Sequence, residues 1–108
     1  MSLLQDFQAT AKTLSKETPD QLGGFMKLMH AVEGEGVLPE KTKHLALVAL
    51  SVANQCTTCI AVHVNGAVKA GADREEILEA AWLAVLMGGG PKLTYMQYVL
   101  RELAENGL

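Results

Sequence analysis

Apolar residues recur along the chain at the spacing of amphipathic helices. Leu4, Phe7 and Ala11 lie on one such stripe, which predicts a first helix over about residues 2–16. The chain has no sustained alternation of apolar and polar positions, and no Asn-Gly or Asp-Gly hairpin signal between apolar runs. The pattern therefore favours an all-α fold of five or six helices.

Turn and cap signals place the next two helices. Thr18-Pro19-Asp20-Gln21 has the order of a helix start, with Thr18 as the N-cap and Gln21 three residues later, and predicts a second helix that continues to about Glu33. Two glycines and a proline at 33–39 predict a turn, after which a third helix begins near residues 39–41.

The third helix contains the run LALVALSVA at residues 45–53, which is apolar nearly all round. Such a helix on the surface of a small monomer would leave a large hydrophobic patch exposed. We therefore expect a partner subunit to cover it.

Three more helices are predicted, over residues 56–71, 73–87 and 91–106. Gly71 suits a helix C-terminus, and Asp73 with Glu76 forms a capping pair at the start of the next helix. The segment Gly-Gly-Gly-Pro at 88–91 is expected to separate the last two helices.

Length, composition and charge narrow the function classes. The 108 residues, 49% hydrophobic and 19% charged, fit one folded domain over 1–108. A net charge of -3 without a basic block argues against nucleic-acid binding. The longest apolar run has nine residues, against about 20 for a membrane-spanning helix, and no secretory signal is recognisable, so we expect a cytoplasmic protein with no membrane partner.

The chain has two cysteines, and their spacing points to chemistry. Cys56, Cys59 and His63 stand at positions i, i+3 and i+7, which a helix places within an arc of about 60°. The two thiols are close enough for a disulfide after modest adjustment, and a helix N-terminus stabilises a thiolate. His63 is placed to exchange a proton with Cys59.

Two structural alternatives exist for these residues. The cysteines can be small buried hydrophobes, or they can hold zinc together with His63 and His44. His44 lies twelve residues before Cys56, a separation that suits two packed helices meeting at one site. Against zinc, the Cys-x-x-Cys-x-x-x-His run looks continuously helical, whereas zinc usually gathers such a pair on a turn.

Together these motifs resemble a known family. The segments at 38–43, 70–77 and 87–91, with the Cys-x-x-Cys-x-x-x-His core, are similar to the alkylhydroperoxidase D-like branch of the carboxymuconolactone decarboxylase superfamily. The resemblance implies a helical fold that assembles as trimers or hexamers. It also implies a cofactor-free thiol pair that reduces peroxides or disulfides with electrons from a protein or small-molecule thiol. The lactone decarboxylases of the superfamily do not depend on a cysteine pair, so both cysteines argue against that alternative.

The resemblance also assigns roles to individual residues. Cys56 and Cys59 match the redox pair and His63 the acid/base, with Cys59 as our choice for the peroxide-reactive thiol and Cys56 as the resolving one. The branch usually has a glutamate twelve residues before the first cysteine, where this chain has His44. His44 is either a member of the proton relay or a partly buried core residue.

A carboxylate for His63 would then have to come from elsewhere in the chain. Glu33, Glu35 and Glu40 are the nearest acidic residues in the sequence to this position. We expect all three to be solvated loop or helix-start residues, with a carboxylate contribution to the relay as the alternative.

Overall fold

Six α-helices make up most of residues 2–108, the part of the chain that the computed structural model describes, and no strand occurs there. The helices are α1 (Leu3–Glu17), α2 (Pro19–Glu33), α3 (Glu40–Ala53), α4 (Thr57–Lys69), α5 (Arg74–Gly88) and α6 (Gly90–Glu105). The all-α prediction is confirmed, and the predicted helix boundaries lie within two residues of the observed ones.

The cap signals around residue 72 act as the sequence predicts. The Asp73 carboxylate accepts the Glu76 backbone N–H at 2.8 Å, while the Glu76 carboxylate accepts the Asp73 N–H at 3.1 Å. Just before this capping box, Gly71 adopts a positive φ of 96°, and the Ala72 N–H reaches the Ala67 carbonyl at 2.9 Å. This left-handed residue ends α4 and turns the chain into α5.

Thr18 is the N-cap residue of α2, as the sequence predicts, and Pro19 opens the helix. The Thr18 side chain, however, makes no cap hydrogen bond to α2. Instead the Thr18 hydroxyl donates at 3.1 Å to the Leu14 carbonyl, which also accepts the Thr18 backbone N–H at 2.7 Å. The glycine-rich break is also shorter than predicted, because α5 ends at Gly88 and α6 begins at Gly90.

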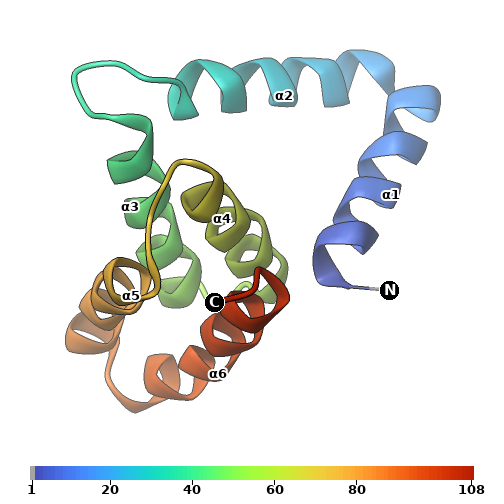
Figure 1. Cartoon of the computed structure of the whole chain (residues 1–108). Helices are drawn as coiled ribbons and strands as arrows, with labels where there is room; N and C mark the ends of the chain where they lie inside the picture. The colour runs from blue at the N-terminus through green and yellow to red at the C-terminus, as the bar shows by residue number, and fades with distance from the viewer. Residues whose placement is uncertain (1) are drawn as a thin grey trace.

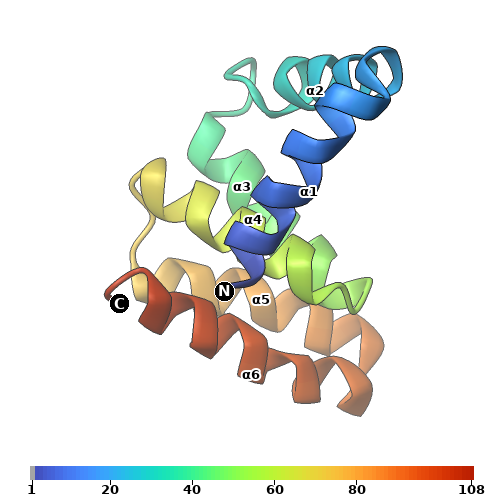
Figure 2. The ribbon, with the colours of Figure 1, turned by 90° about the vertical axis from the view of Figure 1, so that its right-hand side faces the viewer.

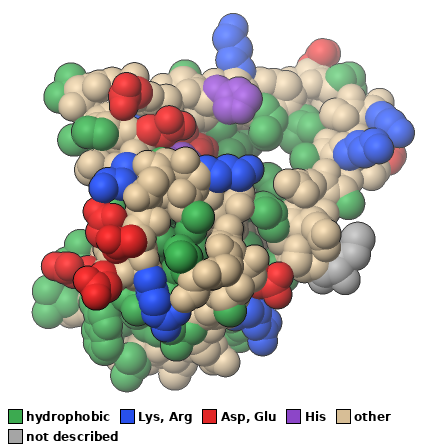
Figure 3. All heavy atoms as spheres, viewed as in Figure 1, with side chains coloured by type: hydrophobic (Ala, Val, Ile, Leu, Met, Phe, Trp, Pro, Cys, Tyr) green, Lys and Arg blue, Asp and Glu red, His purple; other side chains and the backbone are tan. Residues whose placement is uncertain are grey.

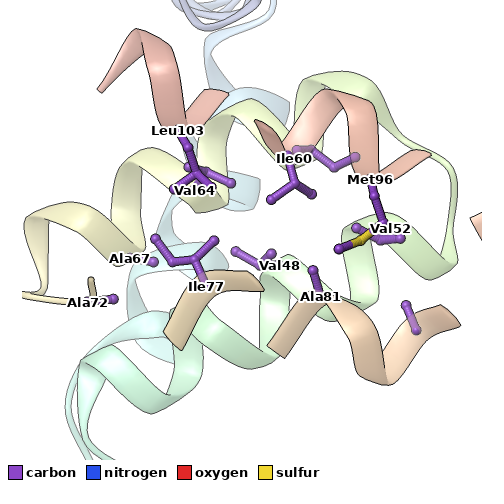
Figure 4. Close-up of a cluster of buried hydrophobic side chains, with 12 residues drawn as sticks. Val48, Val52, Ile60, Val64, Ala67, Ala72, Ile77, Ala81, Met96 and Leu103 are labelled. Carbon is purple, nitrogen blue, oxygen red and sulfur yellow. The ribbon is translucent and has the colours of Figure 1, made fainter. Parts of the chain in front are cut away.

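Helices α3 to α6 form a four-helix body, and α1 and α2 lie beside it as an arm (Figures 1 and 2). Ile60 and Val64 of α4 point into the space between α3, α5 and α6 (Figure 4). Neither α1 nor α2 contributes a fully buried residue among those described. The buried cluster consists of Val48, Val52, Ile60, Val64, Ala67, Ala72, Ile77, Ala81, Ala84, Met96, Val99 and Leu103.

Part of the apolar surface stays uncovered in the single chain. On α3 the buried stripe includes Val48 and Val52, while Leu50 on the other side is 55% exposed. Hydrophobic side chains also gather at the lower left of Figure 3, over α5. The most exposed of these on α5 are Trp82, Leu83, Leu86 and Met87. Coverage by a partner subunit remains a prediction. Among the described helices, none is long and apolar enough to cross a membrane.

The capping box supplies a first testable prediction. Replacing Asp73 with alanine removes the acceptor for the Glu76 N–H and should lower the free energy of unfolding by about 1 kcal/mol. Glu75→Ala is the matched control, because Glu75 lies in the same first turn of α5 but is not part of the capping box. It should change the free energy of unfolding by less than about 0.5 kcal/mol. Urea unfolding of the two variants measures both values, and equal effects would contradict the assigned cap.

Candidate dithiol site

A sharp turn between α3 and α4 places Cys56 at the start of α4. Gln55, a non-glycine residue, adopts a left-handed φ of 51°. The Cys56 N–H donates a hydrogen bond to the Ser51 carbonyl at 3.1 Å. A non-glycine residue in this conformation costs about 1 kcal/mol or more. Lys92 of α6 donates to the Gln55 side-chain oxygen at 2.7 Å and so ties the turn to the body.

The two cysteines form a disulfide across the first turn of α4. Their Cα atoms are 5.2 Å apart. Cys56 is the N-cap residue, and its sulfur accepts the backbone N–H of Cys59 at 3.1 Å. The Cys56 sulfur therefore sits at the positive end of the helix dipole, where a negative charge is stabilised.

Cys59 and His63 both line a pocket of about 400 Å³ between the arm and the body. Cys56, the N-cap residue of α4, is not among its described lining residues. The pocket is mostly apolar. Its lining residues are Phe7, Phe25, Leu28, Met29, Val32, Glu33, Leu47, Thr58, Cys59, Val62 and His63.

His44 and His63 come together from neighbouring helices. Their ring centroids are 6.0 Å apart, and His44 is only 8% exposed. Gly66 permits this arrangement, because a Cβ at that position would lie 2.6 Å from His44 Nδ1. His44 is thus a buried residue beside His63, and its membership of a proton relay stays a prediction.

Glu33 supplies a carboxylate to the histidine pair. Its Oε1 lies 3.8 Å from His44 Nε2, and its side chain is 19% exposed. The expectation that Glu33 is solvated is wrong, because the arm folds the end of α2 over the pocket. Glu40 reaches His44 Nε2 only at 4.0 Å and is 55% exposed, and Glu35 is exposed, as the sequence predicted for both.

Lys43 fixes the position of Glu33, a role that sequence reasoning missed. Its ammonium donates to the Val32 carbonyl at 2.8 Å and to the Gly34 carbonyl at 2.6 Å, on either side of Glu33. A cation at a helix C-terminus also interacts favourably with the helix dipole. Lys43 precedes His44 directly, so α3 holds both the histidine and the end of α2 that faces it.

The surroundings of His63 favour its neutral form. Burial is the main reason that the pKa of His63 is lowered from 6.5, and the nearby His44 lowers it further. The Glu33 carboxylate acts in the opposite direction and raises this pKa, but it does not outweigh burial. A neutral imidazole at neutral pH is able to accept a proton.

The set of two cysteines and two histidines considered for zinc is not assembled in the structure. Cys56 and Cys59 are bonded to each other. Within residues 2–108, the group of potential metal ligands that does come together is Glu33, His44 and His63, and it includes no cysteine.

The structure is an all-α fold in which Cys59 and His63 line one pocket, and comparison with known proteins shows which family has this fold. The chain belongs to the carboxymuconolactone decarboxylase family, whose model matches residues 19–102. Among curated relatives, "Uncharacterized protein 4 in cox locus" of Paracoccus denitrificans is 38% identical over 75% of this chain and 73% of its own. An uncharacterized protein of Cupriavidus necator is 33% identical over 81% of this chain and 77% of its own.

Solved structures agree with this assignment. A carboxymuconolactone decarboxylase family protein from Legionella pneumophila has a TM-score of 0.90 and 41% identity, with 95% of this chain and 92% of that chain covered. A family member from Thermotoga maritima, described as a candidate for involvement in an antioxidative response, has a TM-score of 0.83 and 29% identity. That match covers 95% of this chain and 87% of the other.

Because the His44 ring lies so close to Gly66, alanine substitutions at Gly66 and at Gly24 should change the free energy of unfolding in opposite directions. Gly66→Ala should lower the free energy of unfolding by about 1–3 kcal/mol, because the new methyl group overlaps the His44 ring. Gly24→Ala in α2, where nothing lies within 4 Å, should raise it by about 0.5–1 kcal/mol. Thermal and urea unfolding report both. A stabilising Gly66→Ala would show that the helices are less closely packed than described.

The lowered pKa of His63 predicts how this residue titrates. In metal-free protein, the midpoint of the His63 ring-proton NMR shift should fall below 6.5. Because the folded state disfavours the charged imidazole, His63 contributes stability above its unfolded pKa of about 6.5, and this contribution is lost as pH falls towards the folded pKa. His63→Gln assigns the resonance, and the urea-unfolded chain is the reference. A folded midpoint at or above the unfolded one would contradict the burial argument.

Proposed function

We propose that this protein is a thiol peroxidase or disulfide reductase that uses Cys56 and Cys59 as its redox pair. The observation that carries the proposal is the disulfide at the start of α4, with Cys59 and His63 lining the same apolar pocket. Family membership and the Thermotoga maritima relative described as a candidate for an antioxidative response are consistent with it.

The first step consumes the peroxide at Cys59. His63 accepts the thiol proton, and the Cys59 thiolate attacks the terminal oxygen of a hydroperoxide, ROOH. The O–O bond breaks, the alcohol ROH leaves with a proton returned by His63, and Cys59 becomes a sulfenic acid. Glu33, 3.8 Å from His44, orients the histidine pair and balances the transient positive charge.

The second step closes the disulfide. The Cys56 thiol gives its proton to solvent, and the thiolate, stabilised by the Cys59 N–H and the helix dipole, attacks the Cys59 sulfur. The S–O bond breaks, and the departing hydroxide takes a proton back from solvent and leaves as water. An external dithiol then returns two electrons and two protons to the pair. Attack of that donor on Cys59 expels Cys56, whose position at the helix N-terminus makes it the better leaving group.

We also propose that the protein assembles as a homo-oligomer. The uncovered apolar side chains of α5, with Leu50 on α3, offer the surface that a trimer or hexamer would bury. The described pocket lining includes no residue of α5, so a contact through α5 uses a surface other than that lining.

A thiol titration tests the chemistry directly. Reduced, metal-free protein treated with one equivalent of an organic hydroperoxide should lose two thiols, with a mass decrease of about 2 Da on closing the disulfide. The titration and intact-mass measurement are made on the same samples. Two unchanged thiols would contradict the proposal and favour a decarboxylase or scaffold function.

The two serine variants separate the roles of the cysteines. Cys56→Ser should still react once at Cys59, giving a sulfenic acid that a dimedone-type reagent traps with a single mass increment. Cys59→Ser should consume no peroxide, although it retains one thiol, and therefore serves as the matched control. Trapping at Cys56 in Cys59→Ser would reverse the assignment of the attacking thiol.

A further inference from the structure

The group of Glu33, His44 and His63 has a composition that suits a transition-metal ion. One ligand atom from each residue lies within 4.8 Å of the other two. Two imidazole nitrogens and one carboxylate oxygen form a donor set that zinc enzymes and non-haem iron proteins use. None of the three residues stands close to another in the sequence, so the site exists only because α2, α3 and α4 meet.

The ligand atoms are close to the spacing that an ion requires. Zinc bonds to nitrogen and oxygen of about 2.0–2.2 Å place tetrahedral ligands about 3.4 Å from one another. His44 Nε2 and Glu33 Oε1 are already 3.8 Å apart. Because all three ligand atoms lie within 4.8 Å of one another, no pair must shorten by more than about 1.4 Å, a change on the scale of small side-chain rotations.

The imidazole groups are available as ligands. His63 Nδ1 is buried and has no hydrogen-bond partner among the described residues, and the same is true of His44 Nδ1. Buried polar atoms are normally paired, so the unpaired Nδ1 of His63 requires an explanation, and an ion bound at that nitrogen would provide one. His44 faces Glu33 with its Nε2, which is the nitrogen it offers to the same ion, while its Nδ1 lies on the Gly66 side.

The site is also reachable from solvent. Glu33 and His63 line the pocket of about 400 Å³, while His44 closes the site from behind. Three protein ligands leave at least one coordination position, which would be directed towards the pocket and filled by water. Structural zinc sites are closed by four protein ligands, so the geometry corresponds to an exchangeable site.

From this arrangement we propose that Glu33, His44 and His63 bind one divalent transition-metal ion, with Zn²⁺ as the reference metal. The proposed site uses neither sulfur atom of Cys56 and Cys59, but it shares His63 with the proposed redox chemistry. It differs from the zinc set considered from the sequence, since a carboxylate from α2 replaces both thiolates.

The test measures zinc binding to the oxidised protein, in which the closed disulfide removes the thiolates as competing ligands. Untagged protein is titrated with Zn²⁺ by calorimetry, and Co²⁺ is used as an optical probe of coordination. We expect one ion per chain and a Co²⁺ spectrum without sulfur-to-metal charge transfer. Binding of much less than one equivalent would overturn the proposal, as would a spectrum that requires sulfur ligands.

Matched variants locate the site. Glu33→Gln keeps the shape of the side chain and should weaken Zn²⁺ binding at least about tenfold. Glu35→Gln, two residues away and exposed, should leave it unchanged. His44→Gln against the exposed His30→Gln forms the second pair. If His44→Gln does not fold, as shown by loss of its helical circular dichroism, the comparison of Glu33→Gln with Glu35→Gln tests the site alone. Equal Zn²⁺ affinities of Glu33→Gln and the wild type would refute the site. Since the thiols stay oxidised, a negative result here leaves the peroxide titration unaffected.

Discussion

The close packing of α3 against α4 is the constraint on which the site depends. Gly66 has no side chain, so the His44 ring of α3 lies directly against α4, one turn from His63. The same contact helps to bury Val48 and Val64, and therefore connects the core of the four-helix body to the chemistry at its edge. A helix usually gains about 1 kcal/mol from alanine in place of glycine, and here the site requires that this gain be given up.

The arm of α1 and α2 has a different role. It adds no fully buried residue among those described, so its contribution to the core is small. It closes one side of the pocket instead, and it brings the Glu33 carboxylate to the histidine pair. Lys43 holds the end of α2 through two backbone carbonyls, so these hydrogen bonds help to position the Glu33 carboxylate.

The helices were predictable from the sequence because their signals are local, whereas the complete site was not. Asp73 with Glu76 and the left-handed Gly71 act within a few residues, and the structure confirms them. Cys59 and His63 share a helix face, which spacing alone indicates. Glu33 belongs to another helix, and its proximity to His44 follows from how the 34–39 loop returns the chain. Nothing in the local sequence distinguishes it from the exposed Glu35.

His63 is where the two proposals meet, and they make incompatible demands on it. As a proton acceptor for Cys59 it must keep the lone pair of its neutral imidazole free, and burial favours that neutral form. As a metal ligand it donates an imidazole lone pair to the ion. A glutamate in place of His44 would put two carboxylates beside His63 and favour the protonated imidazole. With His44 at this position, the cluster has one carboxylate and a second nitrogen donor. This composition favours a protonated His63 less and suits a metal ion better.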